Sequence, residues 1–313
     1  MSKNTIDLHM HTSMSDGSDS PLSMLDKIIN AGIATFSFTD HDDLRSNLII
    51  LDELNKNSAK YKDITFYTGI EFSSIYFGRG IHLLAYGFDP NHVLMVNLVS
   101  KGVANRKTRI KKLFTHLETK HNIKLPLVDK VKILSLDTPG KVHIANAIIN
   151  NNLVPNYTFD QVFQSFLKDF KAPEFKIAAN EIIKIVKSVG GVVSLAHPIE
   201  IQKNHNLDLN ELSDFLLELK RFGLGAIEAY HSSHTGAHIQ DYLALAQKHK
   251  LLVSGGSDYH GSNKESAMLG KLNSDSYQVE ASEFTMLDAI FPNYGYRAKS
   301  CKHFKGICIN EKT

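Results

Sequence analysis

Short runs of apolar residues alternate along the chain with longer segments in which apolar residues recur at helical spacing. The short runs predict strands at 6–11, 35–40, 64–73, 80–88, 191–198, 225–230 and 251–258. The amphipathic segments predict helices at 21–33, 45–59, 178–189, 208–222 and 236–249. Ser20 followed by Pro21 is typical of a helix start. Repeated strand–helix units predict a parallel sheet, either open or closed into a barrel.

This alternation is interrupted between residues 92 and 172. A long basic segment predicts one helix over 91–121, and two shorter segments predict helices at 141–151 and 158–168. We therefore expect residues 92–172 to form a helical insertion within a unit that spans 1–273. Residues 274–313 are expected to be a C-terminal extension, whose role the sequence does not indicate.

Composition narrows the classes of function. A chain of 313 residues that is 42% hydrophobic has enough apolar side chains for a sizeable core. The formal net charge of +2 argues against a protein that binds long nucleic acid or membranes mainly through charge. The two cysteines make no disulfide framework, and no apolar stretch approaches the ~20 residues of a membrane helix. Because the first residues lack a signal-peptide pattern, we expect a cytoplasmic protein.

Side chains that can bind metal gather where the predicted strands end. They are His9, His11, Asp40, His41, Glu71, His197, Asp258 and His260, with His82 and Glu228 inside or near strands. The carboxyl ends of parallel barrel strands face one mouth, and residues two apart on a strand share a face. A lone histidine is more often structural, and Asp40 or Asp258 could cap a helix or form a turn. The joint pattern nevertheless predicts a metal site, and imidazole with carboxylate suits Zn, Mn or Fe.

Six motifs, in this order, resemble the polymerase-and-histidinol-phosphatase (PHP) family of metal-dependent phosphoesterases. They are DLHMHTSMSDG (7–17), FTDHDDL (38–44), GIEFS (69–73), IHLLAYGF (81–88), LAHP (195–198) and GGSDYHG (255–261). The segments KVHIANAI (141–148) and GAIEAYHSSHT (225–235) are similar to a bacterial subgroup within it. That subgroup hydrolyses nucleoside 3′,5′-bisphosphates and trims short RNA from the 5′ end. The resemblance implies an α/β fold, a distorted (β/α)7 TIM-like barrel with a helical insertion.

The resemblance also implies two or three divalent metal ions, with Mn, Fe and Zn left open. Carried over residue by residue, it assigns His9, His11, Glu71 and Asp258 to a first ion. Glu71 would bridge to a second ion that His82 and His197 also hold. Asp16, His41 and His260 would hold a third, and Asp16 occupies a position that varies between His and Asp in the family.

The implied reaction is hydrolysis of a phosphomonoester by metal-bound hydroxide, most plainly at the 3′-phosphate of a nucleoside 3′,5′-bisphosphate. Asp40 is expected to orient a ligand histidine, with helix capping as the alternative. Arg106 and Arg109 share a helical face and could bind a second phosphate, although a solvated basic face is the alternative. His143, His231 and His234 match subgroup positions near the substrate, and His234 could protonate the leaving oxygen; a structural loop histidine is its alternative.

Other functions stay open at this point. Histidinol-phosphate or AMP phosphatase activity on the same fold needs no second phosphate site and leaves the basic insertion unexplained. A non-catalytic PHP module is disfavoured because every identified ligand position holds a competent residue. We expect a small nucleotide phosphate or a short oligonucleotide as partner, without long nucleic acid or membrane. The sequence does not reveal the oligomeric state.

Overall fold

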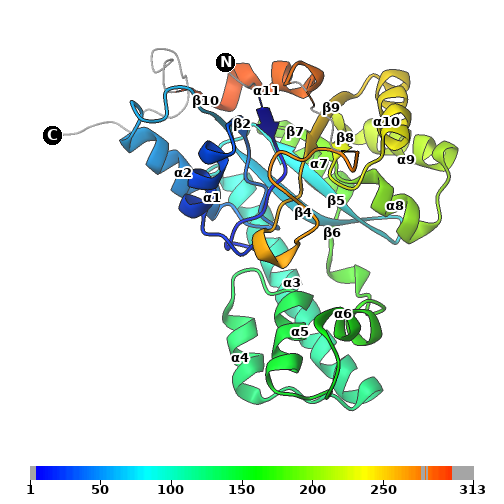
Figure 1. The fold of residues 1–313 in the computed structure, drawn as a ribbon. Helices are drawn as coiled ribbons and strands as arrows, with labels where there is room; N and C mark the ends of the chain where they lie inside the picture. The colour runs from blue at the N-terminus through cyan, green and yellow to red at the C-terminus, as the bar shows by residue number, and fades with distance from the viewer. Residues whose placement is uncertain (1–4, 276–278, 280, 298–313) are drawn as a thin grey trace.

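Two β-sheets form the centre of the protein (Figure 1). The computed structural model describes residues 5–275, 279 and 281–297. The first sheet has the order β1 (Thr5–Asp7), β2 (Ile33–Phe36), β3 (Thr65–Tyr67) and β10 (Gly295–Arg297). The second has the order β6 (Ile177–Ala178), β4 (Gly69–Tyr76), β5 (Arg79–Tyr86), β7 (Val192–Leu195), β8 (Ala226–His231) and β9 (Leu252–Gly256).

Helices cover the sheets and build a separate lobe below them (Figure 1). Those around the sheets are α1 (Pro21–Asn30), α2 (Arg45–Lys56), α7 (Ala179–Ser188), α8 (Pro198–His205), α9 (Leu209–Phe222), α10 (Gly236–His249) and α11 (Met286–Tyr294). As the sequence predicts, α1 begins after Ser20, whose hydroxyl accepts a hydrogen bond from Ser23 N. Within the described residues, no helix has the length and apolarity required to cross a membrane.

The mixed α/β organisation is confirmed, but the uniformly parallel sheet is not. Strands β1, β2 and β3 are parallel neighbours, as are β7, β8 and β9. Strand β5, in contrast, runs antiparallel to both β4 and β7. The reason is a tight hairpin: Phe77 and Gly78 have φ of 45° and 74°, the conformation that a two-residue hairpin turn requires. The described strands do not close into one sheet, so the predicted barrel closure is not confirmed.

The segments that follow β1 and β9 lie side by side. Leu8 N donates to Gly255 O at 3.2 Å, and Asp258 N donates to His9 O at 2.7 Å. At Gly256 this approach leaves no space for a side chain, because a Cβ there would lie 2.2 Å from His9 N. Glycine at this position therefore brings His9 next to the end of β9.

Strand β1 is shorter than predicted. It ends at Asp7, so His9 and His11 lie beyond the strand instead of within it. The cause is the buried Asp7 carboxylate, which accepts hydrogen bonds from the backbone N–H groups of His9, Ser257 and Gly270 at 3.3, 2.9 and 2.9 Å. These contacts replace the regular ladder. The predicted strand at 64–73 likewise divides into β3 and β4.

The lobe contains α3 (Val93–His121), α4 (Leu127–Ser135), α5 (Lys141–Asn150), α6 (Phe159–Val162) and a π-helical turn at Phe163–Leu167. Its apolar side chains form a cluster distinct from that of the sheets, including Leu113, Leu117 and Ile148. The sequence analysis did not predict α4, whose residues Leu127 and Val128 are exposed. The exact limits of the insertion, 92–172, stay a prediction.

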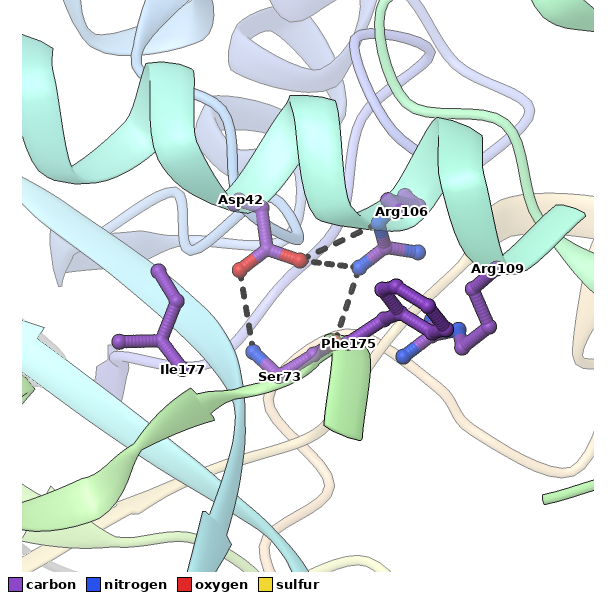
Figure 2. A pocket seen from close by; sticks show the side chains of 7 residues that line it. Asp42, Ser73, Arg106, Arg109, Phe175 and Ile177 are labelled. Atoms are coloured by element: carbon purple, nitrogen blue, oxygen red, sulfur yellow. Dashed lines mark hydrogen bonds and ion pairs between the residues drawn. The ribbon is translucent and has the colours of Figure 1, made fainter. Parts of the chain in front are cut away.

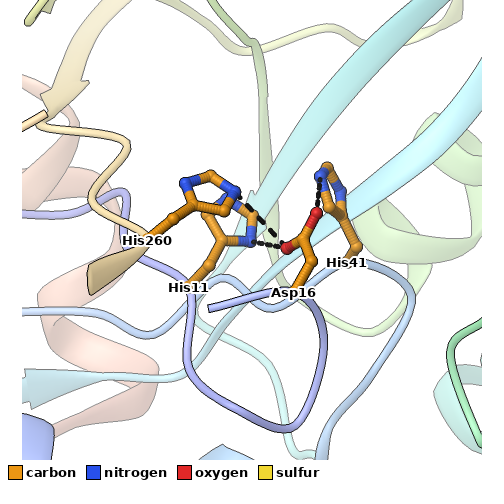
Figure 3. A group of neighbouring side chains, drawn as sticks. All are labelled: His11, Asp16, His41 and His260. Carbon is orange, nitrogen blue, oxygen red and sulfur yellow. Dashed lines mark ion pairs between the residues drawn. The ribbon is translucent and has the colours of Figure 1, made fainter. Parts of the chain in front are cut away.

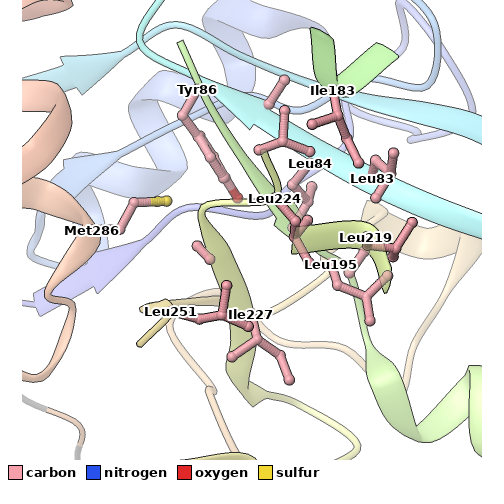
Figure 4. Close-up of a cluster of buried hydrophobic side chains, with 14 of the residues drawn as sticks. Leu83, Leu84, Tyr86, Ile183, Leu195, Leu219, Leu224, Ile227, Leu251 and Met286 are labelled. Atoms are coloured by element: carbon pink, nitrogen blue, oxygen red, sulfur yellow. The ribbon is translucent and has the colours of Figure 1, made fainter. Parts of the chain in front are cut away.

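The described part of the expected C-terminal extension packs into the main body. Phe284, Met286 and Ile290 are buried in the large apolar cluster, whose centre lies between α7, α9 and the second sheet (Figure 4). Strand β10 pairs antiparallel to β3. The extension therefore contributes side chains to the main core and a strand to the first sheet, while residues 276–278, 280 and 298–313 lie outside the described residues.

Candidate metal centre

Four side chains converge on one point beside the ends of β1 and β9. His9, His11, Glu71 and Asp258 each offer a ligand atom within 4.8 Å of the others, and all four are buried. Glu71 Oε2 lies 3.2 Å from His9 Nε2 and 3.0 Å from His11 Nε2. Asp258 Oδ1 lies 3.4 and 3.2 Å from the same two nitrogens. This is the set that the sequence analysis assigned to the first ion.

These spacings fit a metal ion. Ligand atoms bound at about 2.1 Å stand about 3.0 Å apart at right angles and about 3.4 Å apart at the tetrahedral angle. The 3.0–3.4 Å separations between the nitrogens of His9 and His11 and the oxygens of Glu71 and Asp258 fall in this range. The donor set of imidazole and carboxylate could hold Zn, Mn or Fe.

Glu71 also reaches a second group of histidines through its other oxygen. Oε1 lies 2.9 Å from His82 Nδ1 and 3.0 Å from His197 Nε2. His41 Nδ1 approaches Oε2 at 3.2 Å. The two carboxylate oxygens therefore face different histidine groups, the arrangement expected of a bridging ligand between two ions.

A third group surrounds Asp16 (Figure 3). Asp16 Oδ1 lies 3.3 Å from His260 Nε2, and Oδ2 lies 3.7 Å from His41 Nε2. His11 joins this group as well, because its Nδ1 lies 3.6 Å from Asp16 Oδ1 while its Nε2 faces Glu71. The structure thus brings all nine predicted ligand residues together and places His11 between two of the groups.

The backbone is strained at two of these residues. His197, between β7 and α8, has φ of 26°, and Asp258, just after β9, has φ of 55°. Positive φ is uncommon for residues other than glycine and gathers at functional sites. At both positions the strain turns a side chain toward Glu71 or toward the first histidine pair.

Two carboxylates without an assigned role in the sequence lie beside the ligand histidines, and Glu228 forms hydrogen bonds there, whereas His197 Nδ1 beside Glu200 has none. Glu228 Oε1 lies 2.9 Å from His9 Nδ1, and its Oε2 accepts a hydrogen bond from His197 N at 2.6 Å. Glu200 Oε2 lies 3.4 Å from His197 Nδ1. A carboxylate on the outer nitrogen fixes the tautomer that leaves the inner nitrogen free for a metal. The signal for Glu228 was its position in a buried strand, where apolar residues are usual.

The described contacts of Asp40 are with residues other than the ligand histidine that the sequence predicts. Its buried carboxylate accepts hydrogen bonds from Thr12 N and Thr12 Oγ1, both at 2.8 Å, and from Ser15 Oγ at 2.6 Å. Among the described contacts of Asp40 there is none with a histidine, and α2 is capped at Leu44 without a side-chain bond. Asp40 therefore fixes the turn that carries Asp16, and the predicted histidine contact is absent.

The carboxylates and histidines of the centre shift each other's pKa values, and the carboxylates favour positive charge there. Burial lowers the pKa of His11, but Asp258 and Glu71 outweigh it and raise that pKa to about 10. Burial raises the pKa of Glu71, yet the surrounding histidines hold it well below its ordinary value. Several ring nitrogens are also buried without a hydrogen bond, including His11 Nε2 and His82 Nδ1. Metal ions would satisfy these nitrogens and displace the protons that the carboxylates attract.

An open pocket of about 250 Å³ gives access to the centre. Its lining includes the predicted ligands Asp16, His41, Glu71, His82, His197, Asp258 and His260. Val142 reaches it from α5 of the helical lobe, and Glu200, Asn263 and Lys264 complete the wall. The lobe therefore forms part of the mouth through which a ligand reaches the centre.

Arg106 is buried and already paired. Its Nη2 contacts Asp42 Oδ2 and donates to Ser73 Oγ at 2.9 Å, and its Nε donates to Asp42 Oδ2 at 3.2 Å (Figure 2). Arg109 and Phe175 line the same small cavity. Asp42 thus neutralises the charge of Arg106, and Nη1 is the guanidinium nitrogen that neither Asp42 nor Ser73 contacts.

Arg109 and Lys176 differ from Arg106, because no described residue forms a hydrogen bond or ion pair with either. Burial and the charge of Arg106 lower the pKa of Arg109 to about 10. Burial and the charges of both arginines lower the pKa of Lys176 to about 8. Lys176 is distant from Arg109 in the chain, and no pattern in the sequence indicates that the two are neighbours. Asp42 offsets these two charges only in part, without a hydrogen bond or ion pair to either, so the two side chains form a positive region at the cavity that Arg106 lines.

The three histidines predicted near the substrate occupy different positions. His143, in the first turn of α5, accepts a hydrogen bond from Gly140 N at 3.0 Å. His231 and His234 are both fully buried. His231 Nε2 lies 3.5 Å from Asp258 Oδ2, and His234 Nδ1 donates to Ala229 O at 2.8 Å. None of the three lines the pocket at the centre, and their roles in substrate binding or proton transfer stay predictions.

Comparison with known sequences identifies relatives over most of the chain. The PHP domain matches residues 7–195. A phosphoribosyl 1,2-cyclic phosphate 1,2-diphosphodiesterase from Eggerthella lenta is 28% identical, covering 82% of this chain and 94% of that protein. A 5′-3′ exoribonuclease from Haemophilus influenzae is 27% identical, covering 81% and 89%. A 3′,5′-nucleoside bisphosphate phosphatase from Chromobacterium violaceum is 23% identical, covering 82% and 87%.

Solved structures share the fold. A Chromobacterium violaceum protein described as an amidohydrolase, solved with bound sulfate, superimposes with a TM-score of 0.76 at 20% identity. The match covers 96% of this chain and all of that one, 100%. A Bifidobacterium adolescentis protein assigned as a metal-dependent phosphoesterase gives a TM-score of 0.71 at 24% identity, covering 92% and 94%. The arrangement of both sheets and the helical lobe is therefore a shared architecture.

Proposed function

We propose that this chain, which belongs to the PHP domain family and is a metal-dependent phosphoesterase, hydrolyses phosphomonoesters of nucleotides. The preferred substrate would be a nucleoside 3′,5′-bisphosphate, cleaved at the 3′-phosphate, with short 5′-phosphorylated oligoribonucleotides as further substrates. The observation that carries this proposal is the pairing of two features. A cluster of metal-ligand side chains faces an open pocket, and two cations without an ion-pair partner among the described residues, Arg109 and Lys176, lie at the small cavity that Arg106 lines. Lys176 is close enough to the ligand residue His82 for its charge to help lower the pKa of that histidine.

The ligand assignment follows the three groups around Glu71 and Asp16. We assign His9, His11, Glu71 and Asp258 to a first ion, Glu71, His82 and His197 to a second, and Asp16, His41 and His260 to a third. When bound, such ions lower the pKa of a coordinated water and neutralise phosphoryl oxygens. Glu228 keeps His9 Nε2 facing the first group, and Asp40 holds the turn that presents Asp16. The cytoplasmic location also stays part of this proposal.

The second phosphate of the substrate would be bound by the basic side chains of the insertion and of residue 176. An anion is favoured where a partly buried cation lacks an ion-pair partner, as at Arg109 and Lys176 among the described residues. Arg106 can add a contact only through Nη1, since Asp42 and Ser73 occupy its other donors. The relatives from Haemophilus influenzae and Chromobacterium violaceum, an exoribonuclease and a bisphosphate phosphatase, support a substrate of this class.

A panel of substrates tests the proposal. The metal-loaded protein would be assayed on adenosine 3′,5′-bisphosphate, AMP, histidinol phosphate, a ribose cyclic phosphate and a short 5′-phosphorylated oligoribonucleotide. We expect the bisphosphate to give the highest kcat/KM, with two or three metal ions per chain by elemental analysis. A higher kcat/KM on histidinol phosphate, AMP or the cyclic phosphate would contradict the bisphosphate as the preferred substrate. Absence of hydrolysis with full metal loading would favour a non-catalytic module.

The Glu228→Gln variant is expected to bind Mn²⁺ or Zn²⁺ about 10- to 100-fold more weakly, as is typical when a carboxylate behind a ligand histidine is lost. Glutamine keeps the size of the side chain but offers one oxygen to two donors, His9 Nδ1 and His197 N. Competition with a chelator of known affinity measures the change. The Glu218→Gln variant, on the exposed face of α9, serves as the control and should bind metal as the parent does. Equal affinities in the two variants would contradict the orienting role of Glu228.

The Arg109→Ala variant is expected to have a KM for adenosine 3′,5′-bisphosphate about 10- to 100-fold higher than the parent, because one charge-assisted hydrogen bond to the second phosphate is lost. The KM for AMP should change little, because AMP lacks the second phosphate. Steady-state kinetics on both substrates measure the difference. The neighbouring Lys107→Ala variant, which removes a charge from the same helix, is the matched control. Equal increases for both substrates would show that Arg109 does not recognise the second phosphate.

A further inference from the structure

Lys264 stands apart from the other residues that line the pocket at the metal centre. It follows the short 3-10 helix Gly261–Asn263, and its side chain is one-third exposed, at 32%. The other lining residues are histidines, carboxylates, Val142 and Asn263. Lys264 is thus the lining residue that carries a permanent positive charge at neutral pH.

The ammonium group of Lys264 contacts Asp258, one of the four residues assigned to the first ion. Asp258 lies between Lys264 and the histidine pair, and it faces each of them with a different oxygen. Its Oδ1 faces His9 Nε2 and His11 Nε2 at 3.4 and 3.2 Å, whereas its Oδ2 contacts Lys264 Nζ. A metal ion on the Oδ1 side therefore leaves the contact with Lys264 in place.

Hydrogen bonds connect the segment that carries Lys264 to the loop that carries Asp16. Ser262 N donates to Ser18 Oγ at 2.9 Å, and Asn263 Nδ2 donates to Asp16 O at 2.8 Å. Ala267 N closes the turn behind Lys264 by donating to Lys264 O at 3.1 Å. Because both ends of this turn are held, the ammonium group is positioned before a ligand arrives, which reduces the entropy lost on binding.

We propose that Lys264 is a catalytic residue that donates a hydrogen bond to an oxygen of the scissile phosphoryl group. The inference rests on the proposed function and adds a contact that the nine ligand residues do not supply. In the reaction, the oxygen of water bonds to phosphorus, the ester bond breaks and the leaving oxygen takes a proton from solvent. Lys264 keeps its own protons and stabilises the charge that spreads over the phosphoryl oxygens.

A purely structural role would give a different result. If Lys264 served only to hold Asp258, its loss would weaken metal binding, and turnover would recover at saturating metal. A contact with the phosphoryl group instead predicts loss of turnover in the fully loaded protein. It also predicts weaker binding of inorganic phosphate, which shares the tetrahedral oxygens of the scissile group.

The test compares the Lys264→Met, Lys264→Arg and Lys271→Met variants of the metal-loaded protein. Lys264→Met is expected to lower kcat/KM by about 10²- to 10³-fold, the usual effect of removing one donor that stabilises transition-state charge. Metal content and thermal midpoint should match the parent, and Lys264→Arg should recover part of the activity. Lys271→Met removes a nearby charge outside the pocket and should leave turnover unchanged.

The inhibition constant of inorganic phosphate provides a second measurement, and isothermal titration of phosphate onto the loaded protein provides a third. The proposal is overturned if Lys264→Met retains parental kcat/KM and phosphate affinity, or if saturating metal restores both. If the parent hydrolyses no substrate of the panel, the proposed function fails. Phosphate titration of the parent and Lys264→Met would still decide whether Lys264 contacts the anion.

Discussion

Replacing Glu71 by glutamine is expected to reduce turnover by more than about 10³-fold, beyond the usual effect of losing a single transition-state donor. Glu71 is the residue that the two inner histidine groups share, with Oε2 toward His9 and His11 and Oε1 toward His82 and His197. An amide offers one weak oxygen ligand in place of two charged ones. One assigned ion would lose a ligand and the other would keep only a weak, uncharged one, and steady-state assays at saturating metal measure the result.

Elemental analysis distinguishes this explanation from simple unfolding. Glu71→Gln should bind fewer ions per chain than the parent, while circular dichroism shows the same helix content. The Glu53→Gln variant, on α2 away from the pocket, is the control and should keep full metal content and activity. Near-parental turnover of Glu71→Gln in metal-replete buffer would refute the assignment of Glu71 as the shared ligand.

Replacing Asp42 by alanine is expected to lower the free energy of unfolding by about 3–5 kcal/mol, the usual cost of leaving one member of a buried ion pair alone. Asp42 and Arg106 are both buried, with side chains 4% and 9% exposed. Without Asp42, the guanidinium group keeps Ser73 as its described hydrogen-bond partner. Urea denaturation, followed by circular dichroism, measures the loss.

A double-mutant cycle provides the control. The Asp42→Ala/Arg106→Met variant removes both charges and should recover much of the stability that Asp42→Ala loses. Strictly additive losses would show that the pair contributes no coupling. The cycle also separates the roles of Arg106: if it contacts the second phosphate through Nη1, Arg106→Ala will raise the KM for bisphosphates at a temperature where the variant is fully folded.

That these side chains gather in one place was predictable, whereas the path of the backbone through the centre was not. A single histidine or carboxylate at a strand end is not informative, but their recurrence at several strand ends predicts a metal site, and the family resemblance assigned them to groups. Strand β5 was predicted to belong to a parallel sheet, because alternation of strands and helices does not reveal a hairpin. The turn at Phe77 and Gly78 reverses the chain, and only Gly78 carries a sequence signal for it.

Contacts between distant residues account for most of the remaining differences. Asp40 and Glu228 are both carboxylates beside the histidines, and sequence alone gives no reason to prefer one as the orienting group. The structure separates them by their neighbours, since Asp40 faces Thr12 and Ser15 while Glu228 faces His9. Lys176 and Arg109 likewise become neighbours only through the fold.

The close approach of Gly256 to His9 has a consequence for how the protein is made. His9 and His11 leave the ribosome early, but Asp258 and His260 follow almost 250 positions later in the chain. At about 5–20 residues per second, that interval lasts roughly 12 to 50 seconds. During it, β2 and Glu71 are already available to the histidine pair, but the first group of ligands lacks Asp258 and is incomplete. Complete metal loading is therefore a late event in biogenesis, set by the arrival of β9.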